Sequence, residues 1–233
     1  PFFFLQPTTE SQILSGLVGS EMCIRDSSSG SATCLLGSNG SGKTTILKLL
    51  SSITSIGSGK VCINGKEISP SDPLSRQYSL YIGHNASLYP SLSGKENLLF
   101  ISGLYGLHAN KDKIRECLGY LSLEKHCDKQ IKFYSQGMLQ RLKLAMADLI
   151  PTPILYLDEP LSSLDQEGRD LFNDLIIKWK NINRTMLIAT HNIDWALNVV
   201  DRIITVSYTH LRAHETREDR VCSDVREKKK EGG

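Results

Sequence analysis

Apolar residues recur along this chain in two spacings, one typical of buried strands and one typical of helices. Short continuous apolar runs occupy residues 32–36, 153–157 and 186–190, as expected for strands that are buried on both faces. Each run is too short for a helix and is followed by small or polar residues. Further short strands are predicted over residues 60–66, 80–83 and 202–206.

Between these runs, apolar residues three and four positions apart predict helices. Residues 93–96 read Ser-Gly-Lys-Glu, a capping-box pattern that marks the start of a helical region without strands. Alternating strands and helices predict an α/β fold with a mostly parallel sheet, and the helical region predicts a helical subdomain inserted at about residues 91–150. The predicted helices cover residues 43–53, 110–123, 135–150, 168–179 and 193–200.

Neither spacing is found at the two ends of the chain. Residues 16–27 and 206–216 resemble the translated read-through of a sequencing adaptor. The less specific interpretation, a pair of disordered tails, has the same structural consequence. We therefore expect residues 1–27 and 207–233 to be non-native or disordered segments and residues 28–206 to form one domain.

Composition and charge indicate which kinds of partner and cellular compartment to expect for this chain. The formal net charge of +2 is too small to favour a nucleic-acid or anionic membrane surface, so we expect no nucleic-acid partner. The six cysteines include no C-x-x-C pair and are expected to be reduced, as in the cytosol. No apolar run reaches the length of a membrane-spanning helix, which predicts a soluble chain that acts at a membrane only through another chain.

A glycine-rich loop follows the first buried run and precedes a predicted helix, and it matches G-x-x-x-x-G-K-[ST] completely. Glycines allow backbone N–H groups to approach phosphates, and the helix dipole favours the same anion. Lys43 is suited to the β- and γ-phosphates and the Thr44 hydroxyl to Mg²⁺. The sequence therefore predicts an ATP site, against the alternative of a flexible turn. Its predicted residues are Gly37, Ser38, Asn39, Gly40, Ser41, Gly42, Lys43, Thr44 and Thr45.

Two carboxylates, Asp158 and Glu159, close the buried run at residues 153–157. The carboxyl ends of parallel strands form the usual ligand crevice of an α/β sheet. Asp158 is predicted to hold Mg²⁺ and Glu159 to polarise the attacking water. An acidic pair at this position can also be only a helix cap, but its place beside a phosphate loop favours the catalytic interpretation.

The start of the third predicted helix of the subdomain, Tyr-Ser-Gln-Gly-Met at residues 134–138, resembles the signature motif of ATP-binding subunits of ABC transporters. By this resemblance, Ser135, Gln136 and Gly137 would meet the γ-phosphate of ATP bound to a second subunit. Taken alone, Ser135 is simply a good helix cap.

The resemblance extends to Leu-Ser-Ser-Leu-Asp at residues 161–165, which is similar to the family's D-loop, and to His191, which follows a buried strand as the family's switch histidine does. It covers about residues 31–206 and identifies the fold as that of a P-loop NTPase. It implies a homodimer that holds ATP and Mg²⁺ between its subunits, with Asp165 near the nucleotide and His191 at the γ-phosphate.

Two positions depart from the family pattern. His84 stands where the family usually has a glutamine that touches Mg²⁺ and water, so the sequence does not establish a metal contact at this position. The family's adenine-stacking aromatic lies upstream of the phosphate loop, where the adaptor-like segment stands, and we nominate no residue for it. Residues 83–84, 88–92 and 96–98 resemble the haem exporter subunit used in cytochrome c maturation, although multidrug-type exporters share much of this pattern.

The resemblance implies an ATP-hydrolysing subunit at the cytoplasmic face of the inner or plasma membrane, peripheral to it, which powers a separate membrane-spanning subunit. Lys43, Glu159 and His191 would be its catalytic residues. The alternatives are a soluble ABC ATPase of translation or DNA repair and a truncated, inactive fragment. Neither a second nucleotide domain nor a long coiled coil, which such soluble proteins usually carry, is found in the sequence.

Overall fold

A parallel sheet forms the centre of the molecule. In the computed structural model its strand order is β5-β6-β7-β2-β8, and each neighbouring pair is parallel. The strands are β5 (Ser79–Ile82), β6 (Ile154–Asp158), β7 (Thr185–Thr190), β2 (Ala32–Leu36) and β8 (Arg202–Thr205). The structure describes residues 3–6, 29–54, 60–63, 66–68, 77–83, 88–108 and 110–206.

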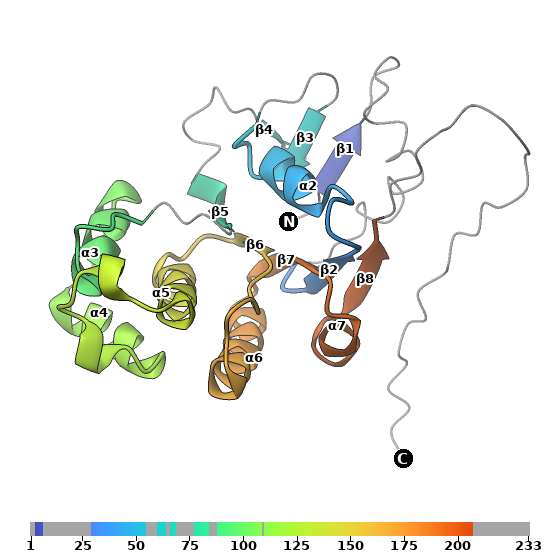
Figure 1. Cartoon of the computed structure of the whole chain (residues 1–233). Coiled ribbons are helices and arrows are strands. Elements are labelled where there is room, and N and C mark those ends of the chain that lie inside the picture. Colours follow the sequence, from blue (N-terminus) through green and yellow to red (C-terminus); the bar gives the residue numbers. More distant parts are fainter. Residues whose placement is uncertain are drawn as a thin grey trace, which may run out of the picture.

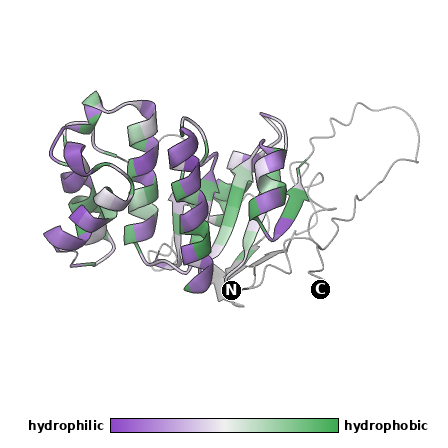
Figure 2. Ribbon diagram, turned by 90° about the horizontal axis from the view of Figure 1, so that it is seen from below, coloured by the Kyte–Doolittle hydropathy of each residue, from purple (hydrophilic) through white to green (hydrophobic). Residues whose placement is uncertain are grey.

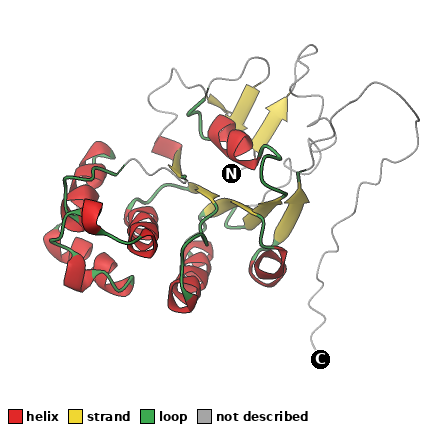
Figure 3. Cartoon of the chain, viewed as in Figure 1, coloured by secondary structure: helices red, strands yellow, loops and turns green. Residues whose placement is uncertain are grey.

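Layers cover both faces of this sheet (Figure 1). Helix α2 (Lys43–Leu50) lies on one face, on the same side as a small antiparallel sheet of order β1-β3-β4. Helices α6 (Gln166–Asn181) and α7 (Ile193–Val199) lie on the opposite face (Figure 3). The α/β fold with a mostly parallel sheet is therefore confirmed. The small sheet consists of β1 (Phe3–Gln6), β3 (Lys60–Ile63) and β4 (Lys66–Ile68).

Alternate residues of the central strands serve two separate cores, which explains why these strands are apolar throughout. On β6, Ile154 and Tyr156 belong to the cluster that α2 completes, whereas Leu155 and Leu157 belong to the larger cluster on the other face. All residues of β6 are buried. Figure 2 shows the apolar strands in the centre and helices with hydrophilic outer faces around them. The position of β6 is thus determined by packing from both sides.

Three helices, α3 (Gly94–Leu104), α4 (Lys111–Tyr120) and α5 (Gln136–Leu149), group beyond the β5 edge of the sheet (Figure 1). The predicted capping box is present: Ser93 Oγ accepts from the Glu96 N–H, and the Glu96 carboxylate accepts from the Ser93 N–H. Two short 3₁₀ helices, η2 (Glu124–His126) and η3 (Ile131–Phe133), connect α4 to α5.

A buried arginine fixes the far end of α5. Arg184 donates to the carbonyls of Ala147, Ile150 and Thr152 at 2.7–2.8 Å. Burial lowers the pKa of the Arg184 guanidinium to about 10, so it remains charged at neutral pH. A cation at the C-terminal carbonyls of a helix also complements the helix dipole. Helix α5 is therefore anchored to the start of β7.

The N-terminal segment requires a correction. We expected none of residues 1–27 to join a sheet, yet Phe3–Gln6 forms strand β1, antiparallel to β3. Its partner lies more than fifty residues later in the chain, so no local pattern announces the pairing. The other residues of the two excluded ends, apart from these four, lie outside the described residues, and so does the nominated His84.

Of the helices in the described part of the chain, none combines the length and the apolar character of a membrane-spanning segment. Among the same residues, Cys34, Cys117 and Cys127 are buried, free thiols.

Candidate functional site

The parallel order of the sheet brings the phosphate loop, the acidic pair and His191 to one edge. The phosphate loop follows β2, Asp158 ends β6, and His191 follows β7, which is the neighbour of both strands. Because all three strands run in the same direction, their carboxyl ends lie at the same edge of the sheet. Motifs that are far apart in the sequence therefore lie together in space.

The phosphate loop wraps the start of α2. Gly40 and Gly42 adopt positive φ angles of 82° and 97°, which side chains rarely tolerate. Lys43 is 6% exposed, and its Nζ donates to the carbonyls of Gly37 at 2.7 Å and Ser38 at 3.0 Å. The ammonium is therefore held inside the curve of the loop, where phosphate oxygens can replace the carbonyls.

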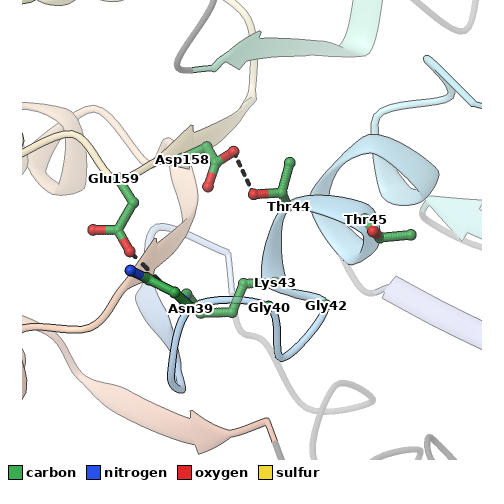
Figure 4. A pocket seen from close by; sticks show the side chains of 8 residues that line it. All are labelled: Asn39, Gly40, Gly42, Lys43, Thr44, Thr45, Asp158 and Glu159. Atoms are coloured by element: carbon green, nitrogen blue, oxygen red, sulfur yellow. Dashed lines mark hydrogen bonds and ion pairs between the residues drawn. The ribbon is translucent and has the colours of Figure 1, made fainter. Parts of the chain in front are cut away.

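An open pocket of about 230 Å³ lies over this loop (Figure 4). Figure 4 shows Thr44 facing Asp158 and Glu159 facing the loop, while Thr45 lies on the other side of the helix start. The residues that line the pocket are Asn39, Gly40, Gly42, Lys43, Thr44, Thr45, Asp158 and Glu159.

Asp158 and Thr44 offer a set of oxygen atoms suited to Mg²⁺. Thr44 Oγ1 donates to Asp158 Oδ2 at 2.8 Å, and Tyr81 Oη donates to the same oxygen at 3.1 Å. Asp158 Oδ1 is buried and has no hydrogen-bond partner within the described residues. A buried carboxylate oxygen without a partner is unfavourable, and a cation would satisfy it. These residues therefore fit the ion.

No cluster of three or more metal-ligating side chains is found in the described part of the chain. Mg²⁺ usually takes one or two carboxylates from the protein and completes its shell with water and phosphates, so Asp158 and the Thr44 hydroxyl are a sufficient set of side chains for it. Burial, followed by the charge of Asp158, raises the pKa of Tyr81, so its hydroxyl stays a donor to the carboxylate.

Glu159 lies at the centre of a polar network. Its carboxylate accepts from Thr190 Oγ1 at 3.3 Å, contacts His191 Nδ1 at 3.0 Å and lies 3.9 Å from Lys43 Nζ. The Glu159 side chain is 23% exposed and that of His191 is 65% exposed. The carboxylate is thus oriented by its neighbours but open to water. The structure pairs His191 with Glu159, and a hydrogen on Nδ1 would be donated to the carboxylate.

The predicted signature residues lie on a different element. Ser135 is the N-cap of α5, where its Oγ accepts from the Met138 N–H at 3.2 Å. Ser135 and Gln136 are exposed, and Gly137 is partly exposed. None of the three lines the pocket at Lys43. Within the described chain, the signature residues therefore do not line their own nucleotide pocket, and their expected contact with the γ-phosphate bound to a second subunit stays a prediction.

Asp165 has partners within its own chain. It is the N-cap of α6, accepts from the Gly168 N–H at 3.0 Å and forms an ion pair with Arg141 at 2.7 Å. The Arg141 guanidinium holds the pKa of the Asp165 carboxyl below its usual value, with the Gly168 N–H as the next cause. The predicted nucleotide contact of Asp165 thus remains a prediction, because the structure gives this side chain a structural role.

Sequence reasoning missed three polar residues that support the site. Tyr81 contacts Asp158, Thr190 contacts Glu159, and Gln140 donates to the Pro160 carbonyl at 2.8 Å. The sequence contains a signal for each of these residues: each places a polar group on an otherwise buried strand or helix face, where the group requires a hydrogen-bond partner. The signal does not identify that partner.

The close packing of the phosphate loop leads to a stability prediction. A Cβ at Gly37 would lie 2.5 Å from the backbone oxygen of Val206, so Gly37→Ala is expected to destabilise the fold by about 1–3 kcal/mol. A Cβ at Gly103, in helix α3, would meet nothing within 4 Å. Gly103→Ala is the matched control and should be neutral or stabilising. Thermal unfolding compares the two variants, and an equal Tm for Gly37→Ala and the unsubstituted chain would contradict this account.

Comparison with known proteins agrees with this geometry. The family model for "ABC transporter" matches residues 25–162. The chain is 35% identical to the cytochrome c biogenesis ATP-binding export protein CcmA of Cupriavidus pinatubonensis, over 71% of this chain and 74% of that protein. It is also 35% identical to the mouse phospholipid-transporting ATPase ABCA3, over 78% of this chain but only 11% of that protein.

Solved structures agree on the fold. A dimeric ATP-binding cassette in a post-hydrolysis state, bound to ADP and Pi, matches with a TM-score of 0.71 and 24% identity. The match covers 78% of this chain and 83% of that cassette.

Proposed function

This chain belongs to the ABC transporter family as an ATP-binding subunit, and on that premise we propose that it hydrolyses ATP to power a separate membrane-spanning subunit. The observation that carries the proposal is the convergence of Lys43, Asp158 and Glu159 at one pocket. A phosphate-binding lysine, a metal-binding carboxylate and an open carboxylate base are the parts that phosphoryl transfer to water requires.

The chemistry follows from the positions of these groups. Lys43 and the N–H groups of the loop bind the phosphates of ATP and offset their charge. Thr44 and Asp158 would hold Mg²⁺, which supplies charge neutralisation at the phosphate oxygens. The Glu159 carboxylate, which is partly open to water, accepts a proton from the water that attacks the γ-phosphate. ATP and water then become ADP and phosphate, and the proton passes from Glu159 to solvent.

His191 supports Glu159 in this proposal. Its Nδ1 lies 3.0 Å from the carboxylate, and its side chain is exposed. The ring orients Glu159 toward the attacking water and can reach the γ-phosphate through its second nitrogen.

A second copy of the chain is part of the proposal. The pocket at Lys43 contains no residue of α5, and Ser135 and Gln136 are exposed at the start of that helix. A helix N-terminus favours an anion, so these residues are free to meet the γ-phosphate of ATP on a partner subunit. The dimeric state of a solved cassette with the same fold supports this arrangement.

We further propose haem export for cytochrome c maturation as the transport process, which would associate the chain with the cytoplasmic face of a membrane. The support is the name of the CcmA relatives, which match over most of their length. A phospholipid-transporting relative has the same sequence identity to this chain, although the match covers only a small part of that protein. Transport of a different cargo is therefore the alternative outcome of the test.

A chromosomal Glu159→Gln substitution in the source organism tests the cargo. Haem-stained c-type cytochromes should fall to near the level of a deletion strain, because the exporter loses its ATPase. The control is Glu116→Gln, which removes a charge from the exposed surface of α4. Normal holo-cytochrome levels in the Glu159→Gln strain would exclude haem export while leaving the ATPase to be judged on the purified protein.

A further inference from the structure

The turn that carries Glu159 has an unfavourable backbone conformation. Glu159 and Ser163 adopt positive φ angles of 50° and 62°. Non-glycine residues in this region cost about 1–3 kcal/mol each and persist only where the surroundings hold them. Between them, the Ser162 N–H donates to the Glu159 carbonyl at 3.1 Å, which closes a tight turn. Some neighbouring element must therefore hold the turn in place.

Helix α5 supplies that element. Gln140 is only 6% exposed, and its Nε2 donates to the carbonyl of Pro160, the residue directly after Glu159, at 2.8 Å. Leu144, one turn further along the same face of α5, is fully buried. A buried amide among apolar side chains is favourable only while it is hydrogen-bonded, so this contact resists displacement.

Two further contacts of α5 hold the other end of the turn. A Cβ at Gly137 would lie 2.9 Å from the Ser163 carbonyl oxygen, so the turn lies directly on the helix backbone. Arg141 forms ion pairs with Asp165 at 2.7 Å and Glu167 at 3.1 Å. The turn is thus held on the same helix that begins with Ser135.

We propose that Gln140 is a positioning residue for Glu159: its amide holds the Pro160 carbonyl and thereby keeps the preceding carboxylate directed at the phosphate loop. The inference rests on the proposed ATPase function. Gln140 lines no part of the pocket and acts only through the turn. When this hydrogen bond is lost, the left-handed Glu159 relaxes and its carboxylate leaves the position it needs for proton transfer.

The test substitutes Gln140→Met, which keeps an unbranched side chain of similar length but removes the donor. The kcat for ATP hydrolysis should fall about 10-fold or more, whereas KM for ATP should stay within about 2-fold, because phosphate binding does not depend on the turn. Gln166→Met is the matched control: Gln166 also donates a side-chain amide hydrogen bond, to Asp170 at 2.9 Å, but on the exposed surface of α6. Gln140→Glu serves as a second variant should Gln140→Met fail to fold.

Hydrogen exchange provides a readout independent of activity. The N–H groups of Glu159, Ser162 and Leu164 donate within the turn or to β7, and they should exchange at least about 10-fold faster in Gln140→Met. The N–H of Met186, which donates to Ser31 in the central sheet, should be unaffected. Faster exchange at the turn together with a fall in kcat supports the proposal.

Other outcomes overturn the inference. Wild-type kcat in Gln140→Met, or a lower kcat with unchanged exchange at the turn, would show that Gln140 does not position Glu159. If the unsubstituted chain fails to hydrolyse ATP, the proposed function fails instead. In that case, the rate of hydrogen exchange at the turn alone shows whether Gln140 holds the turn in place.

Discussion

Glu159→Gln is expected to lower ATP turnover by about 10²–10⁴-fold, the loss typical of a removed general base, while ATP binding stays nearly intact. Glutamine has the same shape and can keep the contacts with Thr190 and His191, but its amide cannot accept a proton from water. The lost charge lies 3.9 Å from Lys43 and faces the phosphate site, so its removal does not weaken the attraction for ATP. Phosphate release and equilibrium binding of ATP measure the two effects separately.

The matched control for this experiment is Glu116→Gln, which removes the same charge from the exposed surface of α4 and should turn over ATP at the unsubstituted rate. Chelation of Mg²⁺ provides the background rate, since Thr44 and Asp158 are expected to act together with the ion. If Glu159→Gln hydrolyses ATP at the unsubstituted rate in the presence of Mg²⁺, Glu159 is not the general base.

The central strands could be predicted from sequence because they are buried on both faces. Residues 153–157 and 186–190 were expected as strands, and the structure has Ile154–Asp158 and Thr185–Thr190. Where both neighbours of a strand are other strands and both faces carry packed layers, nearly every position must be apolar. The prediction that Asp158 and Glu159 follow a buried strand depends only on this pattern.

The association of the motifs was also predictable, since parallel strands place their carboxyl ends at one edge. The pairing of individual side chains was not. His191 contacts Glu159, and Asp165 contacts Arg141, because these side chains come from different elements whose separation depends on tertiary packing. Gln140 could be noticed as a polar residue on a buried helix face, but its acceptor, the Pro160 carbonyl, comes from a turn twenty residues later.

Strand β1 could not be predicted from the sequence for a different reason. Four residues of strand carry too little periodicity to be distinguished from a coincidental apolar run, and the register with β3 depends on residues at positions 60–63. Resemblance to an adaptor sequence is an argument about the origin of the segment. It does not exclude a short strand, because pairing to an exposed edge depends mainly on backbone groups.

Ser135→Arg is expected to abolish ATP-dependent dimerisation while each chain still binds ATP. Ser135 is exposed at the N-terminus of α5 and is not part of the pocket at Lys43, so its own chain does not need it for binding. In the proposed dimer this N-terminus meets the γ-phosphate on the partner, and an arginine side chain would fill the space that the phosphate must enter. The substitution is made in a Glu159→Gln background, which keeps ATP unhydrolysed, and size-exclusion chromatography with and without ATP measures the dimer.

The substitution also removes a helix cap, which costs about 0.5–2 kcal/mol, so a control must lose a cap without touching the interface. Asn110→Arg fulfils this requirement: Asn110 is the exposed N-cap of α4, and its side chain accepts from the Lys113 N–H at 2.7 Å. In the Glu159→Gln background, Asn110→Arg should be destabilised to a similar degree and still dimerise with ATP. A dimer that persists in Ser135→Arg to the same extent as in the control would mean that the signature residues do not complete the site of a second subunit, whatever the outcome for Glu159.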